Sequence, residues 1–392
     1  MTTGVRWLSV RPGSGYGDAS EAYLSGLRAA CVPVTWTPLG WPSSSWGAPY
    51  GPVYDADLGD APHRDIACRE VEHDTVVVCS TPLWHRQLAV ESDGRLLAAY
   101  TTWETDRLPV DRVRVLNRYD RVLVPSRFNA DVFEASGVAA PVVPVPHIAR
   151  PVHAPNVEGE PAIDAKFIFY VLATWSTRKA IPDAVAAFLT AFTASDDVVL
   201  MIHTTPHDQI AASRPTWLTL ADALAGRREA PEITLSTRAL TRTEVDGLHA
   251  RGDCFVLLSR GEGWGLGAFD AAAHGNPVVV TGWGGTPEFL PRDYPYLVDY
   301  DLVPTTTEAP DAWWRPQRGE RWAKARIEHA ASLLRHIFEH ADEARSWGSA
   351  LQSSVTTGFA ADQVTGRLLD ALDARPDSPR TAEDARWTSA DR

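Results

Sequence analysis

The stretch SRGEGWGLGAFDAAAHGNPVVVTG, residues 259–282, places three glycines and a tryptophan between two acidic residues and follows them with an alanine-rich run. The apolar run CFVLLS at 254–259 predicts a buried strand just before it, and we expect a helix to begin near Leu266. The first amides of a helix lack partners within it and favour an anion. Because the glycines have no Cβ atoms, a phosphate can approach the backbone closely. The stretch therefore fits a diphosphate.

The two acidic residues, Glu262 and Asp270, are at most about 12 Å apart along a helix at 1.5 Å per residue. That separation is too large for a general acid and a general base that share one bond. It suits two carboxylates that accept hydrogen bonds from the hydroxyls of two sugars, one on either side of a diphosphate, as in a nucleotide sugar. A glycine-rich loop with two solvated carboxylates is the alternative interpretation.

Length and composition limit the class of protein. A chain of 392 residues favours two domains, and 44% hydrophobic with 22% charged residues is typical of a globular protein. The net charge of -13 argues against a nucleic-acid partner. The N-terminus lacks a signal-peptide pattern, and no run approaches 18 apolar residues, so we expect a cytoplasmic protein that is at most peripheral to membranes.

Short apolar runs alternate with helical patterns along the chain. VRWLSV at 5–10 predicts a strand, which is followed by a glycine turn and a helix, and further continuous apolar runs are typical of parallel strands buried on both faces. This order predicts an α/β protein with two Rossmann-like doubly wound domains. Residues 321–351 predict one or two helices.

Composition places the domain boundaries. Residues 149–165 are rich in proline and polar residues, so we expect an N-terminal domain over 1–150 and a C-terminal domain over 165–350. A C-terminal helix is expected within 351–375, and the polar, aperiodic residues 376–392 predict a disordered tail.

Several motifs together resemble one family. GEGWGLGAFDAAAHGNPVVVTGWGGTPEFL at 261–290 resembles the nucleotide-sugar signature of family 4 retaining glycosyltransferases of GT-B fold. TWETDRLP at 102–109, VLVPSRFNADVFEASGV at 122–138, VPVPH at 143–147 and TRKA at 177–180 resemble that family in the expected order. The resemblance implies a cleft between the two domains, with the donor bound mainly by the C-terminal domain and the acceptor by the N-terminal one. It also implies that a C-terminal helix crosses back to the first domain.

The resemblance also implies roles for single residues. Lys179, at the lysine position of the family's RKG motif, should neutralise the donor diphosphate, Glu262 should accept hydrogen bonds from donor-sugar hydroxyls, and Asp270 should bind the ribose hydroxyls. The loop positions expected to contact phosphate and sugar, mainly through their amides, are Gly263, Trp264, Gly265, Leu266 and Gly267. The glycine turn after the first strand, with Gly15 and Gly17, should face the diphosphate and the acceptor. A leaving diphosphate needs such cationic and amide stabilisation.

Three positions depart from the family pattern. Asp270 replaces the usual glutamate and is one methylene shorter. Ala173 stands where an arginine is frequent, so Arg178 or Arg260 is expected to supply the second positive charge. Thr101 stands where many members carry a histidine near the reaction centre.

Glu104 follows closely and could orient an acceptor hydroxyl or stabilise positive charge on the donor sugar; pairing with Arg107 is the alternative. We therefore expect catalytic roles for Glu262, Lys179, Glu104 and Thr101. Aromatic rings stack on sugars, and four tryptophans lie in the candidate loops: Trp103, Trp175, Trp264 and Trp283.

The expected reaction is metal-independent transfer of a hexosyl-type unit from a nucleoside diphosphate sugar to an acceptor hydroxyl, with retention of anomeric configuration. The donor is then a co-substrate, and no cofactor is expected. D-x-D pairs at 55–57 and 299–301 are expected to be chance matches rather than metal ligands. A non-catalytic nucleotide-sugar-binding or scaffold subunit is the alternative class. The base, the sugar, the small-molecule or glycan acceptor and the oligomeric state stay open.

Overall fold

The structure is a computed structural model of the chain. It describes residues 2–40, 51–52, 58–59, 61–85, 88, 90, 92–152, 166–204, 216–225, 229–305 and 319–374. The chain divides into two compact units. Unit 1 comprises Met1–Trp103, Arg107–Ile148 and Phe359–Arg392, and unit 2 comprises Glu104–Asp106 and Ala149–Gly358.

Unit 1 is built on one sheet with strand order β3-β2-β1-β4-β5-β6-β7. Its strands are β1 (Val5–Val10), β2 (Val34–Gly40), β3 (Gly51–Pro52), β4 (Thr75–Cys79), β5 (Leu96–Tyr100), β6 (Arg121–Val124) and β7 (Val142–Pro144). Its helices are α1 (Gly15–Ala29), η1 (Arg64–Ile66), α2 (Pro82–His85), α3 (Val110–Leu116), α4 (Arg127–Ala135) and α12 (Ala361–Asp373). The strands pair in parallel except for β3, which is antiparallel to β2. Because successive strands lie first on one side of β1 and then on the other, the sheet is doubly wound.

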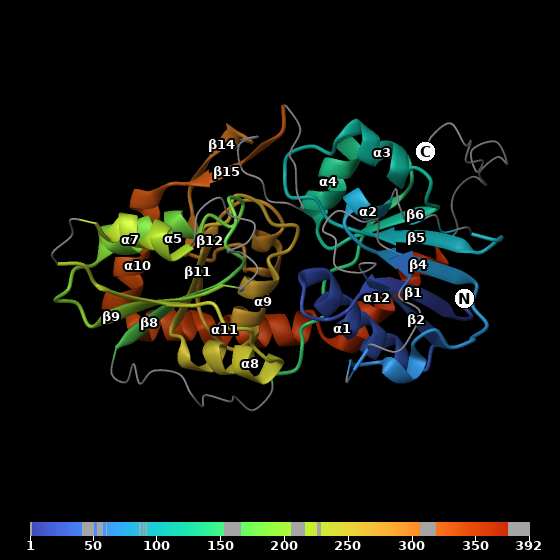
Figure 1. Cartoon of the computed structure of the whole chain (residues 1–392), viewed down its shortest axis with the longest axis horizontal. Helices are drawn as coiled ribbons and strands as arrows, with labels where there is room; N and C mark the ends of the chain where they lie inside the picture. The colour runs from blue at the N-terminus through green and yellow to red at the C-terminus, as the bar shows by residue number, and fades with distance from the viewer. Residues whose placement is uncertain are drawn as a thin grey trace. The chain divides into compact units, whose positions relative to one another are not determined.

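The core of unit 1 is aromatic and lies between the sheet and helices α1 and α12. Trp7, Tyr23 and Tyr100 pack with ring centroids 5.2–6.4 Å apart, beside the buried Trp36. The Tyr23 and Tyr100 hydroxyls lie 2.8 Å apart, with the Pro146 carbonyl oxygen 2.7 Å from Tyr23 and the Val145 carbonyl oxygen 2.9 Å from Tyr100, so burial leaves neither without a partner. Figure 1 shows α1 and α12 on one face of this sheet and α2, α3 and α4 on the other.

Helix α12 is fixed to unit 1 by polar contacts at its end. The Arg121 guanidinium donates to the carbonyl oxygens of Ala371 and Ala374, and the Thr2 amide donates to Asp373 Oδ1 at 2.5 Å. The last carbonyls of a helix have no partner within it, so a cation there stabilises the end. Helix α12, the last helix in the described part of the chain, therefore belongs to the first unit.

Unit 2 contains a parallel sheet with strand order β10-β9-β8-β11-β12-β13 and a two-stranded antiparallel sheet. Its strands are β8 (Phe167–Leu172), β9 (Val198–His203), β10 (Glu232–Ser236), β11 (Cys254–Leu257), β12 (Val278–Thr281), β13 (Leu297–Val298), β14 (Tyr300–Pro304) and β15 (Arg321–Ala325). Its helices are α5 (Ile181–Ala191), α7 (Thr216–Leu224), α8 (Arg242–Arg251), α9 (Leu266–Ala273), η2 (Thr286–Phe289), α10 (Ile327–Glu339) and α11 (Ala341–Gly358).

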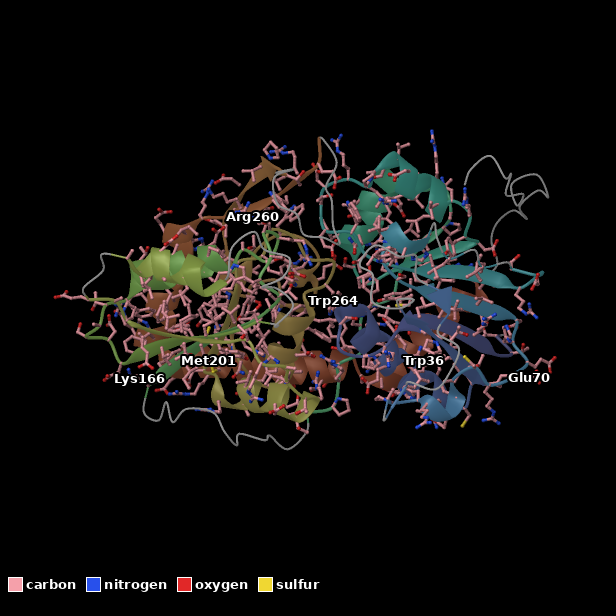
Figure 2. All side chains as sticks on the ribbon, in the orientation of Figure 1. Trp36, Glu70, Lys166, Met201, Arg260 and Trp264 are labelled. Carbon is pink, nitrogen blue, oxygen red and sulfur yellow. The ribbon has the colours of Figure 1, made fainter. Side chains whose placement is uncertain are left out.

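Helices cover both faces of the large sheet in unit 2. Figure 1 shows α5 and α7 over one face and α8 and α11 along the other. The four central strands, β8, β9, β11 and β12, are apolar and mostly buried, as parallel strands covered on both faces should be. Figure 2 shows Met201 of β9 and, in unit 1, Trp36 of β2 among these packed side chains. The predicted α/β class with two doubly wound domains is confirmed.

Three details differ from the sequence predictions. The helix expected at 351–375 is the end of α11 followed by the separate helix α12, because the backbone at Ala360 is extended (φ −57°, ψ 148°). Residues 321–325 are strand β15 rather than helix, since they pair with β14 and bury Trp322 completely. Glu104–Asp106 group with unit 2 although unit 1 flanks them. The predicted tail at 376–392 lies outside the described residues.

Candidate active site

The site lies at the carboxyl edge of the large sheet in unit 2. Strands β8 and β11 are neighbours, and the chain continues from β8 towards one edge of the sheet and from β11 towards the other. Such a switch point opens a crevice beyond the carboxyl ends of the strands. The segments that follow β8 and β11 contain the TRKA and GEGWGLG motifs, so the topology brings the two motifs together.

Helix α9 begins in this crevice at Leu266, as predicted. Its N-cap, Gly265, has a left-handed backbone (φ 90°, ψ 55°), and a Cβ there would lie 2.5 Å from the Thr286 hydroxyl oxygen. Both facts require glycine. Gly265 has no side chain to cap the helix, which leaves the first amides to a ligand. A Cβ on Gly267 would lie 3.3 Å from the Leu172 carbonyl oxygen, so this helix starts directly against the end of β8.

Glu262, Lys179 and Arg178 form a charged cluster in the crevice. Lys179 Nζ donates to Glu262 Oε1 at 2.6 Å, and Arg178 Nη1 lies 3.3 Å from Glu262 Oε2. The three side chains are largely buried. Both carboxylate oxygens of Glu262 therefore face cations.

Charge pairing controls the protonation of this cluster. Burial alone would raise the pKa of Glu262, but the charges of Lys179 and Arg178 and the Lys179 hydrogen bond lower that pKa to about 2. Burial lowers the pKa of Lys179, and the Glu262 charge opposes this change. Glu262 is thus a carboxylate at neutral pH and accepts hydrogen bonds only.

Hydrogen bonds between the two segments fix the position of Arg178. Its Nη1 donates to the Gly261 carbonyl oxygen at 2.7 Å, and its own carbonyl oxygen accepts from the Arg260 amide at 2.7 Å and from the Ser259 hydroxyl at 3.2 Å. Arg260 points elsewhere, because its guanidinium lies 3.7 Å from Asp183 and stacks over the Trp322 ring. Of the two arginines considered for the second positive charge, Arg178 is the one in the cluster.

Glu104 joins the same cluster. Its Oε1 lies 3.9 Å from Arg178 Nη2, and burial together with the Glu262 charge raises its pKa against the opposing charge of Arg178. A Cβ on Gly261 would collide with the Glu104 carbonyl oxygen, so glycine allows the two backbones to touch. Two carboxylates and two cations thus balance in charge: Glu104, Glu262, Arg178 and Lys179.

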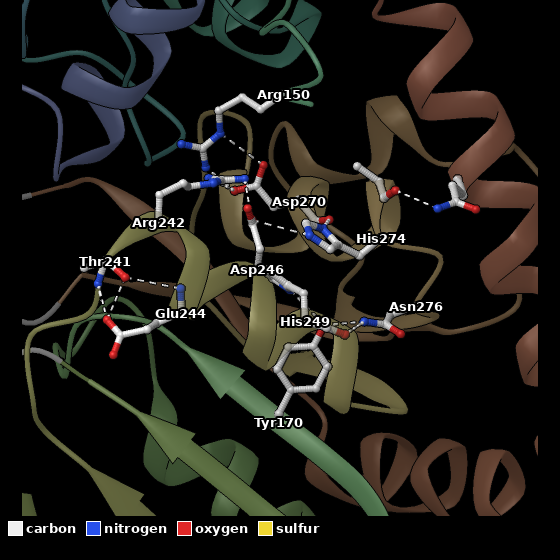
Figure 3. Close-up of polar contacts among 12 residues, drawn as sticks. Arg150, Tyr170, Thr241, Arg242, Glu244, Asp246, His249, Asp270, His274 and Asn276 are labelled. Atoms are coloured by element: carbon white, nitrogen blue, oxygen red, sulfur yellow. Dashed lines mark hydrogen bonds and ion pairs between the residues drawn. The ribbon is translucent and has the colours of Figure 1, made fainter. Parts of the chain in front are cut away.

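Asp270 lies one turn into α9 and is paired with two arginines. Arg150 donates to both of its carboxylate oxygens, and Arg242 Nη1 lies 3.6 Å from Oδ2 (Figure 3). Burial would raise the pKa of Asp270, and the charges of Arg150 and Arg242 lower it. Arg150 and Arg242 were not predicted from the sequence.

The tryptophan prediction is wrong for two of the four positions. Trp264 is 4% exposed and packs against Phe269 and Phe289, with ring centroids 5.4 and 5.7 Å away. Trp103 is also buried, and its Nε1 donates to the Arg107 carbonyl oxygen. These rings stabilise their loops and are not available to stack on a sugar.

Three predicted residues lie in unit 1. Gly15 and Gly17 begin α1, where the Gly17 amide donates to the N-cap hydroxyl of Ser14, and a Cβ on Gly17 would collide with the Arg11 carbonyl oxygen. Thr101, directly after β5, is completely buried. Its hydroxyl has no hydrogen-bond partner among the residues that the structure describes.

The described residues contain no group of three or more metal-ligating side chains. In the D-x-D pair at 299–301, Asp301 accepts a hydrogen bond from Arg326, and Asp299 Oδ2 lies 3.3 Å from His329 Nδ1. The pair at 55–57 lies outside the described residues. Within the described part of the chain, no helix is long and apolar enough to cross a membrane.

The sequence matches the family described as "Family 4 Glycosyltransferase in conflict systems" over residues 125–363, more than half of the chain. The chain therefore belongs to this glycosyltransferase family. A search of curated proteins finds no match.

Solved structures of GT-B glycosyltransferases share the fold. Sucrose-phosphate synthase from Thermosynechococcus elongatus is similar with a TM-score of 0.66 and 15% identity, over 94% of this chain and 99% of that one. HepE from Anabaena, solved with UDP and glucose, has a TM-score of 0.64 and 12% identity over the same shares. The pneumococcal O-GlcNAc transferase GtfA, solved with UDP and GlcNAc, has a TM-score of 0.59 and 10% identity over 95% of this chain and 99% of that one. The likeness supports the GT-B fold of two Rossmann-like domains.

Proposed function

We propose that this chain transfers a hexosyl-type unit from a nucleoside diphosphate sugar to an acceptor hydroxyl, with retention of anomeric configuration and without a metal ion. The observation that carries the proposal is the cluster of Glu262, Lys179 and Arg178 beside the first amides of α9 at a sheet switch point. HepE and GtfA, which share the fold, were solved with UDP and a sugar.

The charged cluster and the first amides of α9 would together bind the diphosphate of the donor. The amides of Leu266 and Gly267 and the charges of Lys179 and Arg178 would bind the diphosphate and stabilise the negative charge that develops as it leaves. The two side chains would thereby supply the positive charge that a divalent metal supplies in other transferases.

The carboxylates face the donor sugar. When Lys179 and Arg178 bind the diphosphate, the Glu262 carboxylate oxygens that they contact can accept hydrogen bonds from sugar hydroxyls. Glu104 lies at the same cluster and would orient a hydroxyl or stabilise positive charge on the sugar. Retention follows if the departing phosphate oxygen takes the proton of an acceptor hydroxyl that attacks from the same face.

Donor binding is the first test. The purified protein would be melted with UDP-, GDP- and dTDP-sugars, because a ligand at 100 times its Kd stabilises the fold by about 2.7 kcal/mol. We expect one nucleotide sugar to raise the Tm of the wild type and of Lys166→Met, but not of Lys179→Met or Glu262→Gln. Lys166 is the matched control, since its Nζ also lies 2.6 Å from a glutamate, Glu232, outside the site.

Turnover is the second test. With the donor that binds, release of nucleoside diphosphate without acceptor would be measured with and without EDTA, and the anomer of the released sugar would be followed by NMR. We expect release that EDTA does not change and a sugar of retained configuration. Loss of activity in EDTA or release of the inverted anomer would contradict the corresponding part of the proposal.

A non-catalytic nucleotide-sugar-binding subunit is the second candidate. The observation that favours it is Thr101, whose side chain is fully buried where the resembling family often has a histidine. Donor binding without turnover in any acceptor screen would support this function over the first.

A further inference from the structure

Residues Glu104–Asp106 are hydrogen-bonded to the start of strand β15. The Asp106 amide donates to the Arg321 carbonyl oxygen at 3.0 Å, and the Arg321 amide donates to Asp106 Oδ1 at 2.7 Å. One residue earlier along both segments, the Thr105 hydroxyl donates to Glu320 Oε2 at 2.5 Å. These hydrogen bonds join two short segments that are 215 residues apart in the sequence.

The contact between Thr105 and Glu320 is buried. Thr105 is completely buried, and Glu320 is 1% exposed. A hydroxyl that donates to a carboxylate makes a charge-assisted hydrogen bond, which is shorter and stronger than a bond between neutral groups. A carboxylate is costly to bury unless such a donor satisfies it. The pair therefore holds residue 105 firmly against the start of β15.

Strand β15 also contacts the glycine-rich loop. The Ala323 amide donates to the Arg260 carbonyl oxygen at 2.9 Å, and the Arg260 guanidinium lies over the buried Trp322 ring, 5.2 Å from its centroid. The Arg260 amide donates in turn to the carbonyl oxygen of Arg178, a member of the charged cluster. One strand therefore fixes both the glycine-rich loop and the segment that contains Glu104.

Glu104 lies where the segment and the loop meet. A Cβ on Gly261 would lie 1.9 Å from the Glu104 carbonyl oxygen, so the two backbones touch. The Glu104 side chain is 18% exposed, and its Oε1 is 3.9 Å from Arg178 Nη2, which is too long for a hydrogen bond. This contact alone fixes the carboxylate only weakly. Its place at the cluster depends on the hydrogen bonds of the two residues that follow it.

Resting on the proposed function, we propose that Thr105 and Glu320 are positioning residues, whose hydrogen bond holds the Glu104 carboxylate at the charged cluster during the reaction. A carboxylate that stabilises charge on the donor sugar, or orients a hydroxyl, must lie at the right distance, and a misplacement of about 1 Å can cost about 100-fold in rate. Diphosphate binding instead uses Lys179, Arg178 and the first amides of α9. The pair therefore acts on kcat rather than on donor affinity.

The test measures kcat, donor KM and Tm, with nucleoside diphosphate release from UDP-, GDP- and dTDP-sugars as the assay. Thr105→Val deletes the hydroxyl at nearly the same volume, Thr105→Ser retains it, and Thr105→Val/Glu320→Met replaces both partners by apolar groups. Thr105→Val is also made in Glu104→Gln. Thr75→Val is the matched control, because the buried Thr75 hydroxyl also donates to a carboxylate, that of Asp74, at 3.0 Å and at the start of β4.

We expect Thr105→Val to lower kcat by about 10- to 100-fold and to change the donor KM by less than about twofold. Thr105→Ser should keep most of the kcat, and Thr75→Val all of it. The double variant should regain the Tm that Thr105→Val loses, because no buried carboxylate is left without its donor, but it should not regain the kcat. In Glu104→Gln, Thr105→Val should lower kcat by less than about twofold, because the charge that it positions is already gone.

Other results overturn the inference and leave the proposed function standing. Wild-type kcat in Glu104→Gln or in Thr105→Val would show that this segment has no part in the reaction, and Thr105→Ser as slow as Thr105→Val would show that the hydroxyl is not the cause. Equal losses from Thr105→Val with and without Glu104→Gln would show that Thr105 does not act through Glu104. Recovery of both Tm and kcat in the double variant would show that the pair only stabilises the fold.

A wild type that releases no nucleoside diphosphate from any of these donors would overturn the proposed function, and this inference with it.

Discussion

Two lysine–glutamate pairs in unit 2 have the same distance between Nζ and the nearer carboxylate oxygen but differ in how far they are buried. Lys179 and Glu262 lie 2.6 Å apart with side chains 18% and 11% exposed, and Lys166 and Glu232 lie 2.6 Å apart with side chains 36% and 45% exposed. The first pair is at the switch point of the sheet. The second joins the start of β8 to the start of β10, at the opposite edge of the sheet.

Because the two pairs have the same distance, differences in their contribution to stability reflect their exposure to water. An exposed pair contributes about 0–1 kcal/mol to the free energy of unfolding, because water screens both charges. A buried pair loses its hydration and depends on its partner, so removing one member leaves a costly buried charge. A protein that retains Lys179 and Glu262 in the crevice holds two charges ready for a ligand, which is typical of functional sites.

The largest expected difference between the two pairs is in activity. Lys179→Met removes a cation from the leaving diphosphate and should lower kcat by about 10²- to 10³-fold, as loss of one transition-state donor does. Lys166→Met should leave kcat within about twofold. The measurement is the rate of nucleoside diphosphate release at saturating donor, with the Tm of each variant checked first. Equal rates in the two variants would remove Lys179 from the mechanism.

Acid should distinguish Glu262 next. Its pKa in the folded chain is about 2, against about 4.3 in an unfolded chain, so it binds protons less readily when folded. The resulting stabilisation, about 3 kcal/mol, is present above the unfolded pKa, and about half of it is lost by pH 3. Urea unfolding from pH 7 to pH 3 should therefore show a steeper loss of stability in the wild type than in Glu262→Gln. Parallel curves would contradict the depressed pKa.

Coupling within each pair is the third difference. In a double-mutant cycle of Lys179→Met and Glu262→Gln, we expect a coupling free energy of about 2 kcal/mol, because Arg178 still compensates part of the charge. The same cycle with Lys166→Met and Glu232→Gln should give below about 1 kcal/mol. Chemical denaturation at neutral pH supplies all seven free energies, since the two cycles share the wild type, and equal coupling in the two cycles would refute the role assigned to burial.

Much of this site could be predicted from the sequence because it consists of local signals. The apolar run before residue 259 and the glycines after Gly261 predict a strand, a glycine loop and a helix start, and α9 does begin at Leu266. Lys179 is one of three lysines in the chain, and the structure pairs it with Glu262. A parallel sheet brings the carboxyl ends of neighbouring strands together. The order of strands and motifs along the chain was therefore sufficient to predict that Lys179 and Glu262 lie in one site.

Long-range contacts could not be predicted in this way. Arg150 lies in a proline-rich stretch with no periodic signal, and only folding brings it to Asp270. The i, i+4 spacing of Arg242 and Asp246 was visible as a possible helical pair, but it is equally common on solvated faces. Trp264 lies in the loop where a ring that stacks on a sugar was expected. Its ring packs against Phe269 instead, and this contact depends on how α9 and η2 pack together.

The smallest expected effect concerns the backbone beside Lys179. Ala180, next to Lys179, is buried and has a left-handed conformation (φ 49°, ψ 39°), which is unfavourable for a residue with a Cβ. Ala180→Gly should therefore stabilise the protein, by about 0.5–1 kcal/mol. Ala350→Gly is the matched control, because Ala350 is exposed within α11 and glycine there should destabilise by a similar amount. Urea midpoints that move in opposite directions would show that the loop carrying Lys179 is strained, and a loss of stability in both variants would show that it is not.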